Sequence, residues 1–221
     1  MTTSGPNYPG TGADDSAVGT LTWSSTGNIV SDNNTDAITG TTGGPSDTHY
    51  LKGTGFGFAI AADQQIDGIT VEFEKYRSGA TGTVKDAVVK LVIGGTVSGS
   101  NLADTGTTWP TSRTTTTYGG ASSLWGLTPT YSDINGATFG VVLSATVTKT
   151  SGKGQHSAVC DFVRVTITHS TAAAGGQPIS KRFGGVPFMG SQPLQGQQRW
   201  IKRVSGLLTP SNEWRPAHGI R

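Results

Sequence analysis

The chain has 221 residues, of which 33 are glycine and only 14% are charged. This balance disfavours long helices, because glycine loses the most backbone entropy when it is ordered. The single cysteine, Cys160, excludes an intrachain disulfide and is expected to be a small buried thiol. No stretch approaches the roughly 18 to 20 apolar residues of a membrane helix, and no secretory signal is visible. We therefore expect a protein made in a cytosol, without membrane attachment.

Charge divides the chain unevenly. Residues 1–171 carry 9 Lys/Arg and 13 Asp/Glu, a net charge of −4, whereas residues 172–221 carry 7 and 1, a net charge of +6. Residues 170–176 between them are small and are typical of a linker. The sequence therefore predicts a flexible N-terminal segment over residues 1–16, a β-sandwich domain over residues 17–171 and a basic extended arm over residues 172–221.

Strand patterns recur throughout the first of these charge regions. Ile69, Val71 and Phe73 alternate with polar residues, which indicates a strand with one buried face. In the last strand Asp161 is the only acid among apolar residues of the same parity, and we expect it near a strand end. The expected strands cover Val18–Trp23, His49–Ile60, Ile66–Tyr76, Ala87–Ile93, Phe139–Val147 and Val159–Ile167. Their number and spacing predict an all-β fold, an antiparallel two-sheet sandwich that is jelly-roll-like.

Three connections carry more specific signals. Gly94-Gly95 predicts a tight hairpin turn, and the Thr-rich stretch over residues 105–117 suits a Greek-key crossover between strands. Residues 131–135 form the only predicted helical turn, with Ser132 or Asp133 as its N-cap. No window of the sequence keeps helical periodicity over three turns.

The C-terminal arm has an unusual composition. Its many prolines and glycines exclude a helix or a long strand, yet it holds large apolar residues in which disordered linkers are depleted. Such side chains need another surface to bury them, so we expect the arm to dock on a neighbouring subunit or another protein. The candidate partner-binding residues are Lys181, Arg182, Phe183, Phe188, Met189, Arg199, Trp200, Lys202, Arg203, Trp214 and Arg215. Nucleic acid is the less favoured partner, because the acidic sandwich would repel a polyanion.

No pattern predicts a catalytic residue, a cofactor or a metal. Glu72 and Glu74 could be a glycosidase pair, but two acids at alternate positions are more often a solvated strand face. Residues 32–36 match part of a calcium loop, although Ala37 and Gly43 stand where an EF-hand needs Gly and Glu. An Asx-rich turn is the simpler interpretation of that loop, and a surface calcium site is the alternative.

Several segments between Tyr50 and Ile167 resemble a β-sandwich module of tailed-phage virion proteins. The matching pieces are Tyr50–Phe58, Ile69–Glu74, Val88–Val92, Tyr118–Gly120, Leu124–Leu127, Phe139–Ser144 and Asp161–Val165. The resemblance covers a little over half of the chain and implies a structural role in capsid decoration or in tails and fibres. It supplies no catalytic residues, and the arm lies outside it.

The first hypothesis is therefore a bacteriophage capsid decoration (cement) protein that is made in the host cytoplasm and resides in the virion. Its partner would be the major capsid protein or another virion protein, and a homo-oligomer is expected, with a trimer as the guess. A tail, baseplate or fibre component is the first alternative. A carbohydrate-binding module is the second, because Trp109, Tyr118, Trp125 and Tyr131 cluster in the sequence and exposed aromatic rings can stack on sugars.

Overall fold

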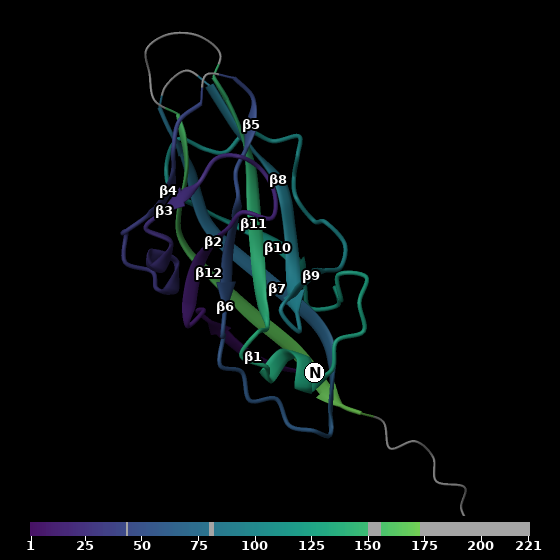
Figure 1. Cartoon of the computed structure of the whole chain (residues 1–221). Helices are drawn as coiled ribbons and strands as arrows, with labels where there is room; N and C mark the ends of the chain where they lie inside the picture. The colour runs from purple at the N-terminus through teal and green to yellow at the C-terminus, as the bar shows by residue number, and fades with distance from the viewer. Residues whose placement is uncertain (43, 80–81, 150–155, 173–221) are drawn as a thin grey trace, which may run out of the picture. The chain divides into compact units, whose positions relative to one another are not determined.

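The computed structural model describes residues 1–42, 44–79, 82–149 and 156–172. Over these residues the chain forms two antiparallel sheets of six strands each, which confirms the predicted all-β two-sheet sandwich (Figure 1). Sheet A contains β1 (Thr2–Asn7), β3 (Trp23–Ser24), β4 (Ala37–Thr39), β7 (Gln64–Ser78), β10 (Thr114–Gly120) and β12 (Ser157–Thr171). Sheet B contains β2 (Thr11–Asp15), β5 (Ser46–Asp47), β6 (Tyr50–Thr54), β8 (Gly82–Ile93), β9 (Thr96–Ser98) and β11 (Gly140–Lys149).

The two longest strands, β7 and β12, pair at the centre of sheet A. The order of that sheet is β10-β7-β12-β4-β3, with β1 also paired to β12. Sheet B has the order β2-β6-β11-β8-β9, and β5 pairs with β11. The connection between β9 and β10 passes from sheet B to sheet A, in agreement with the crossover predicted for the Thr-rich stretch.

The start of the chain differs from the prediction. Residues 1–16 were expected to be a flexible segment ahead of the domain, but they contain β1, which pairs with β12, and β2, which pairs with β6. Residues 18–23 were expected to be a strand, but only Trp23 belongs to one. These early strands are held by partners distant in sequence, so their local composition carries little strand signal.

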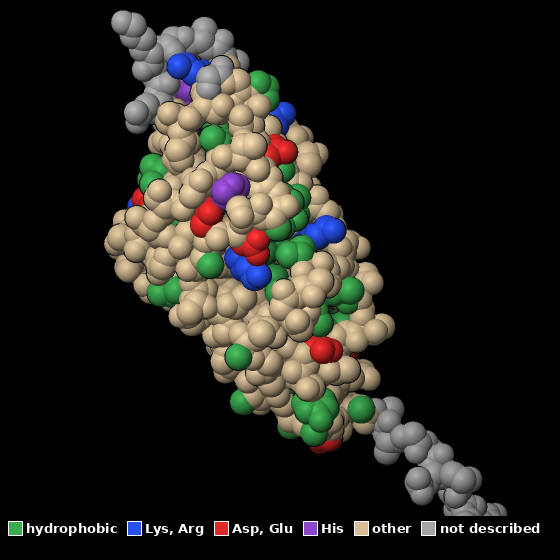
Figure 2. Space-filling view, in the orientation of Figure 1, with side chains coloured by type: hydrophobic (Ala, Val, Ile, Leu, Met, Phe, Trp, Pro, Cys, Tyr) green, Lys and Arg blue, Asp and Glu red, His purple; other side chains and the backbone are tan. Residues whose placement is uncertain are grey.

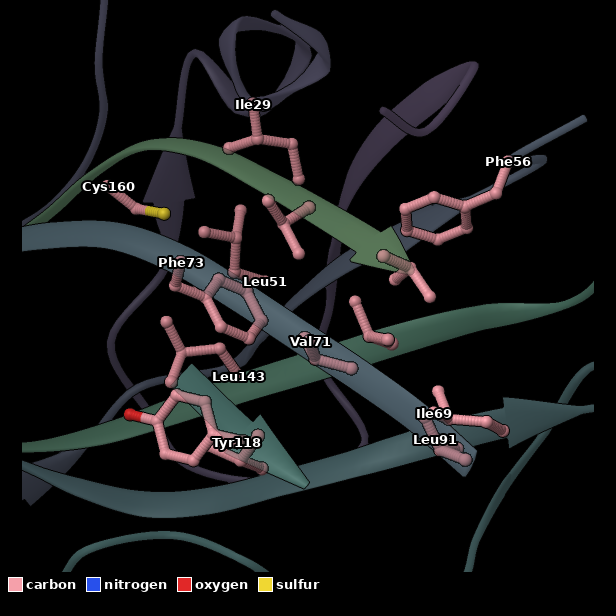
Figure 3. Close-up of a cluster of buried hydrophobic side chains, with 14 of the residues drawn as sticks. Ile29, Leu51, Phe56, Ile69, Val71, Phe73, Leu91, Tyr118, Leu143 and Cys160 are labelled. Atoms are coloured by element: carbon pink, nitrogen blue, oxygen red, sulfur yellow. The ribbon is translucent and has the colours of Figure 1, made fainter. Parts of the chain in front are cut away.

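The core lies between the sheets. Ile69, Val71 and Phe73 of β7 are fully buried, as their alternation predicted, and they meet Leu91 of β8 and Leu143 of β11 from the opposite sheet. Figure 3 shows these side chains converging from strands of both layers. Burying each large apolar side chain contributes about 1.5 to 3 kcal/mol, so this shared interior is the main source of the domain's stability.

A β-bulge changes the pattern of β12. The register against β7 shifts between Cys160 and Phe162, so Asp161 is an extra residue inside the strand rather than a residue near its end. Because the bulge adds one residue, the core-facing parity switches, and both Cys160 and Val163 belong to the core cluster. Simple alternation across the whole strand could not predict this switch.

The predicted turns are present, with one correction. Gly94 and Gly95 connect β8 to β9 and have φ angles of 57° and 84°, the left-handed conformations of a tight hairpin turn. Helix α1 (Tyr131–Asn135) is capped by Thr130 rather than by Ser132 or Asp133. Asp133 instead accepts a hydrogen bond from the Thr130 backbone N–H at 2.8 Å, which completes a capping box.

Truncating Phe73 to alanine should test the importance of the inter-sheet core. We expect Phe73→Ala to lower the free energy of unfolding by about 3 to 5 kcal/mol, because it removes buried apolar surface and leaves a cavity. Thr115→Ala on the exposed side of β10 is the control and should change it by less than about 0.5 kcal/mol. Urea denaturation monitored by tryptophan fluorescence measures both, and equal effects would contradict this account of the core.

Candidate functional site

The eleven predicted partner-binding residues of the arm lie outside the described residues. The structure therefore bears only on the sites expected within residues 1–172. Within the part of the chain that is described, no helix is long and apolar enough to cross a membrane.

Three of the four aromatic residues considered for sugar binding are core residues. Trp109, Tyr118 and Trp125 are 3%, 5% and 2% exposed and belong to the core cluster between the sheets. The Trp125 indole N–H donates to the Ile69 carbonyl oxygen at 2.9 Å. Only Tyr131, at 36% exposure, offers a ring to solvent, so the sequence cluster of aromatics is not a surface cluster.

Tyr131 lies beside a surface groove. The groove has a volume of about 410 Å³ and lies between the start of β7 and the segment that leads into α1. Its lining combines apolar side chains with neutral polar ones: Gln64, Gln65, Ile66, Leu124, Thr128, Pro129, Thr130 and Tyr131. Gln64 and Gln65 already hydrogen-bond neighbouring side chains, so the groove mainly offers a ligand the Tyr131 ring and apolar side chains.

A second polar site covers part of the outer face of sheet A and is centred on Arg113. Its guanidinium donates to both carboxylate oxygens of Asp36, at 2.7 and 2.8 Å. One guanidinium nitrogen, Nη1, also lies 3.6 Å from Glu74 Oε1 and 3.6 Å from Asp161 Oδ2. The Tyr76 hydroxyl donates to Asp36 at 3.0 Å. One arginine therefore lies within ion-pair distance of three carboxylates.

Residues 32–36, the segment considered as a calcium loop, form a turn that contacts the Arg113 site. Asn33 Oδ1 accepts the Thr35 backbone N–H at 2.9 Å, which is the Asx turn expected for such a sequence. Asn34 has a φ of 60° and donates its backbone N–H to Asp161 Oδ2 at 3.1 Å. Among the described residues, no group of three or more His, Cys, Asp or Glu side chains is placed to hold a metal ion.

Two carboxyl groups in the Arg113 site have raised pKa values. Burial is the main cause for both Asp161 and Glu74, and neighbouring carboxylates add to it. Asp161 is fully buried, and its Oδ1 atom has no hydrogen-bond partner. Arg113 opposes these pKa shifts by stabilising the charged forms. Keeping the Asp161 carboxyl charged in its buried position at the β12 bulge therefore costs free energy.

The remaining sequence candidates have structural partners. Glu72 receives hydrogen bonds from its register partner Arg164 at 2.9 and 3.3 Å, a cross-strand ion pair of the kind common on solvated strand faces. Cys160 is fully buried, as predicted, and burial raises the pKa of its thiol. A thiol in that state is a poor nucleophile.

Sequence reasoning missed a charged network inside the sandwich. Lys75 continues the core-facing stripe of Ile69, Val71 and Phe73, and it is only 3% exposed. Its Nζ atom contacts Asp86 Oδ1 and the Tyr118 hydroxyl, and it lies 4.6 Å from the centre of the Trp109 ring. The available signal was a lysine at a position where the alternation calls for an apolar residue.

Asp86 is the partner that makes this burial possible. It is 2% exposed, and it accepts the Trp109 indole N–H at 2.7 Å, the Tyr118 hydroxyl at 2.6 Å and the Asp104 backbone N–H at 3.1 Å. Burial lowers the pKa of Lys75, although Asp86 opposes the shift, and burial is the main cause of the raised pKa of Tyr118. Figure 3 shows Tyr118 beside the apolar core, with its hydroxyl directed away from it.

No protein-family model, curated protein or solved structure matches the chain. The interpretation of its function therefore depends on its residues and their arrangement.

The raised pKa of Asp161 predicts how stability depends on pH. A carboxyl with a higher pKa in the folded state binds more protons when folded, so its contribution to stability is lost as the pH rises from below 3.8 through the folded pKa. Asp161→Asn lacks this term and can still accept the Asn34 N–H. The stability of Asp161→Asn relative to the wild type should therefore increase between pH 3 and about pH 7, as measured by urea denaturation. A constant difference would contradict the shift.

Proposed function

We propose that the chain is a non-catalytic structural protein of a bacteriophage virion, and that it decorates the capsid by docking through its C-terminal arm. The support comes from the resemblance of the sandwich to virion modules, from the composition of the arm and from the surface of the sandwich. A partner among the major capsid protein or other virion proteins, and a homo-oligomeric state, belong to the same proposal.

The sandwich surface has few exposed apolar side chains, and this is the main support for docking through the arm. Within the described residues, the exposed large hydrophobic side chains are Met1, Ile38 and Tyr131. Figure 2 shows apolar side chains in small separate groups on the face in view. Stable protein interfaces need a buried apolar centre, and these dispersed residues offer little for one.

The arm has the composition that the sandwich surface lacks. Its sequence includes Phe183, Phe188, Trp200 and Trp214, and tryptophan and arginine are the residues most enriched at the energetic centres of interfaces. In this proposal the aromatic residues anchor the arm in apolar pockets of the partner, and the neighbouring basic residues pair with acidic groups around them. A tail, baseplate or fibre position would use the same arm, and copy number per particle distinguishes the two locations.

Deleting residues 175–221 tests the docking role of the arm. The truncated chain should remain folded, because the described strands end at Thr171, but it should no longer co-sediment with virion particles prepared without the protein. Circular dichroism checks folding, and co-sedimentation measures binding. Retained particle binding by the folded truncated chain would overturn the proposal.

Two full-length variants separate the apolar anchors from the charges. Trp200→Ala combined with Trp214→Ala should weaken particle binding by about 1,000-fold, since each central anchor contributes about 2 kcal/mol. Replacing Lys202 and Arg203 by Gln is the matched control and should cost less, with its main effect at low salt. A larger loss of particle affinity in the Lys202 and Arg203 variant would show that the charges, and not the tryptophans, dominate binding.

The groove beside Tyr131 favours a second candidate function, glycan binding. The exposed Tyr131 ring could stack on a sugar, and the Thr128 hydroxyl beside it could hydrogen-bond a sugar hydroxyl. Glycan-array binding that is lost in Tyr131→Ala but kept in Trp125→Phe would support this function. An array without hits for the wild type would exclude it for the glycans tested.

A further inference from the structure

The Lys75–Asp86 pair joins the two sheets through the core. Lys75 lies on β7 of sheet A, and Asp86 lies on β8 of sheet B. Both side chains are almost fully buried, and the Lys75 amine touches the Asp86 carboxyl directly. An amine and a carboxyl held together in this way are the two reactants of amide formation.

Burial favours the neutral, nucleophilic form of the Lys75 amine and lowers its pKa. Asp86 and the rings of Trp109 and Tyr118, whose centres lie 4.6 and 5.0 Å from Nζ, stabilise the charged form, but burial is the larger effect. An ammonium has no lone pair, so loss of the proton is what makes lysine reactive towards a carbonyl carbon.

The surroundings of Asp86 favour attack at its carboxyl carbon. Trp109 donates to Oδ1, while Tyr118 and the Asp104 backbone N–H donate to Oδ2. These three donors withdraw charge from the carboxyl group. They are also in place to stabilise the negative oxygen that develops when an amine adds to the carbon, as an oxyanion hole does.

We propose that Lys75 and Asp86 condense within the folded chain to an intramolecular isopeptide bond that links sheet A to sheet B. The reaction is a single self-modification without turnover and requires no oxidant, reductant or cofactor. It is independent of the proposed virion function.

The step balances as a loss of water. A proton passes from the Lys75 ammonium to the Asp86 carboxylate, and the freed Nζ lone pair forms a bond to Cγ. One Cγ–O bond then breaks, and the departing hydroxyl takes a second proton from Nζ. The Tyr118 hydroxyl contacts both Nζ and the carboxyl, so it can carry that proton between them. The products are a secondary amide and one water molecule.

The site has room for the released water. A cavity of about 60 Å³ adjoins the pair, and its lining includes Thr107, Thr108 and Thr116 besides the two reactants. About 10 to 15 Å³ of such volume is enough to hold one water. The water can therefore leave Lys75 and Asp86 without opening the core.

Proximity and burial both favour the amide over the ion pair. Well-oriented intramolecular reactants reach effective concentrations of about 10⁵ to 10⁸ M, which offsets the unfavourable loss of water in aqueous solution. The amide is uncharged, so its formation also removes the cost of keeping two ions out of water.

Mass spectrometry of the full chain decides the proposal. The intact mass should be lower than the sequence mass by one water molecule. Trypsin cannot cleave after a modified Lys75, so digestion should release residues 53–77 joined to residues 86–90 as one branched peptide. Recovery of a fragment ending at free Lys75, with no branched peptide, would overturn the proposal. Dehydration at Asp67-Gly68 would also lower the mass, but it would leave the two peptides separate and so would count against the bond.

Two variants identify the reacting groups. Lys75→Met should restore the full sequence mass, whereas Lys90→Met, the control on β8, should keep the loss of water. Tyr118→Phe retains both reactants and should accumulate the bond more slowly, which a time course of intact mass after expression measures. If Lys75→Met does not fold, the wild-type digest alone gives the answer. Loss of water persisting in folded Lys75→Met would contradict the assignment.

Discussion

Each strand of this sandwich has one face turned towards the opposite sheet, and that face must be apolar or fully paired. Most inward-facing residues are apolar. Lys75 is instead a polar residue with partners, because an unpaired ion between the sheets would cost several kcal/mol. Its partners Asp86, Trp109 and Tyr118 come from β8, from the crossover between the sheets and from β10. The packing at this end of the core therefore depends on one polar contact that fixes three other segments.

The same two-residue period explains which parts of the fold were predictable. Alternation identified the buried face of β7, and the Gly94-Gly95 dipeptide identified the hairpin after β8, because both signals are local. The bulge at Asp161 was not predictable in this way. A bulge depends on the register between β12 and β7, which is a property of two segments distant in the sequence. The buried acid of the Arg113 site follows from that bulge.

Long-range pairing also explains why the sequence did not predict β1, β2 and the Lys75 network. β1 and β2 have few large apolar residues, and they are ordered by β12 and β6 rather than by their own composition. The Lys75 network has the same origin. A lysine in an alternating strand indicates an anomaly, but only the folded chain shows that Asp86 and Tyr118 meet it. The aromatic residues show the opposite error. Their proximity in the sequence suggested an exposed sugar-binding surface, but Trp109, Tyr118 and Trp125 are buried in the core.

The charge pattern within the sandwich bears on where the basic arm finds its partners. Asp15, Asp36 and Glu72 already pair with lysine or arginine of the sandwich itself, and Asp86 is sealed in the core. Each of these pairs also uses a cation of the domain, so the net charge of −4 over residues 1–171 is carried by its other carboxylates. Among the described residues most large apolar side chains are buried within the domain itself, so the domain needs little from the arm for its own stability. The proposed docking role assigns the arm's aromatic and basic residues to a partner outside the chain.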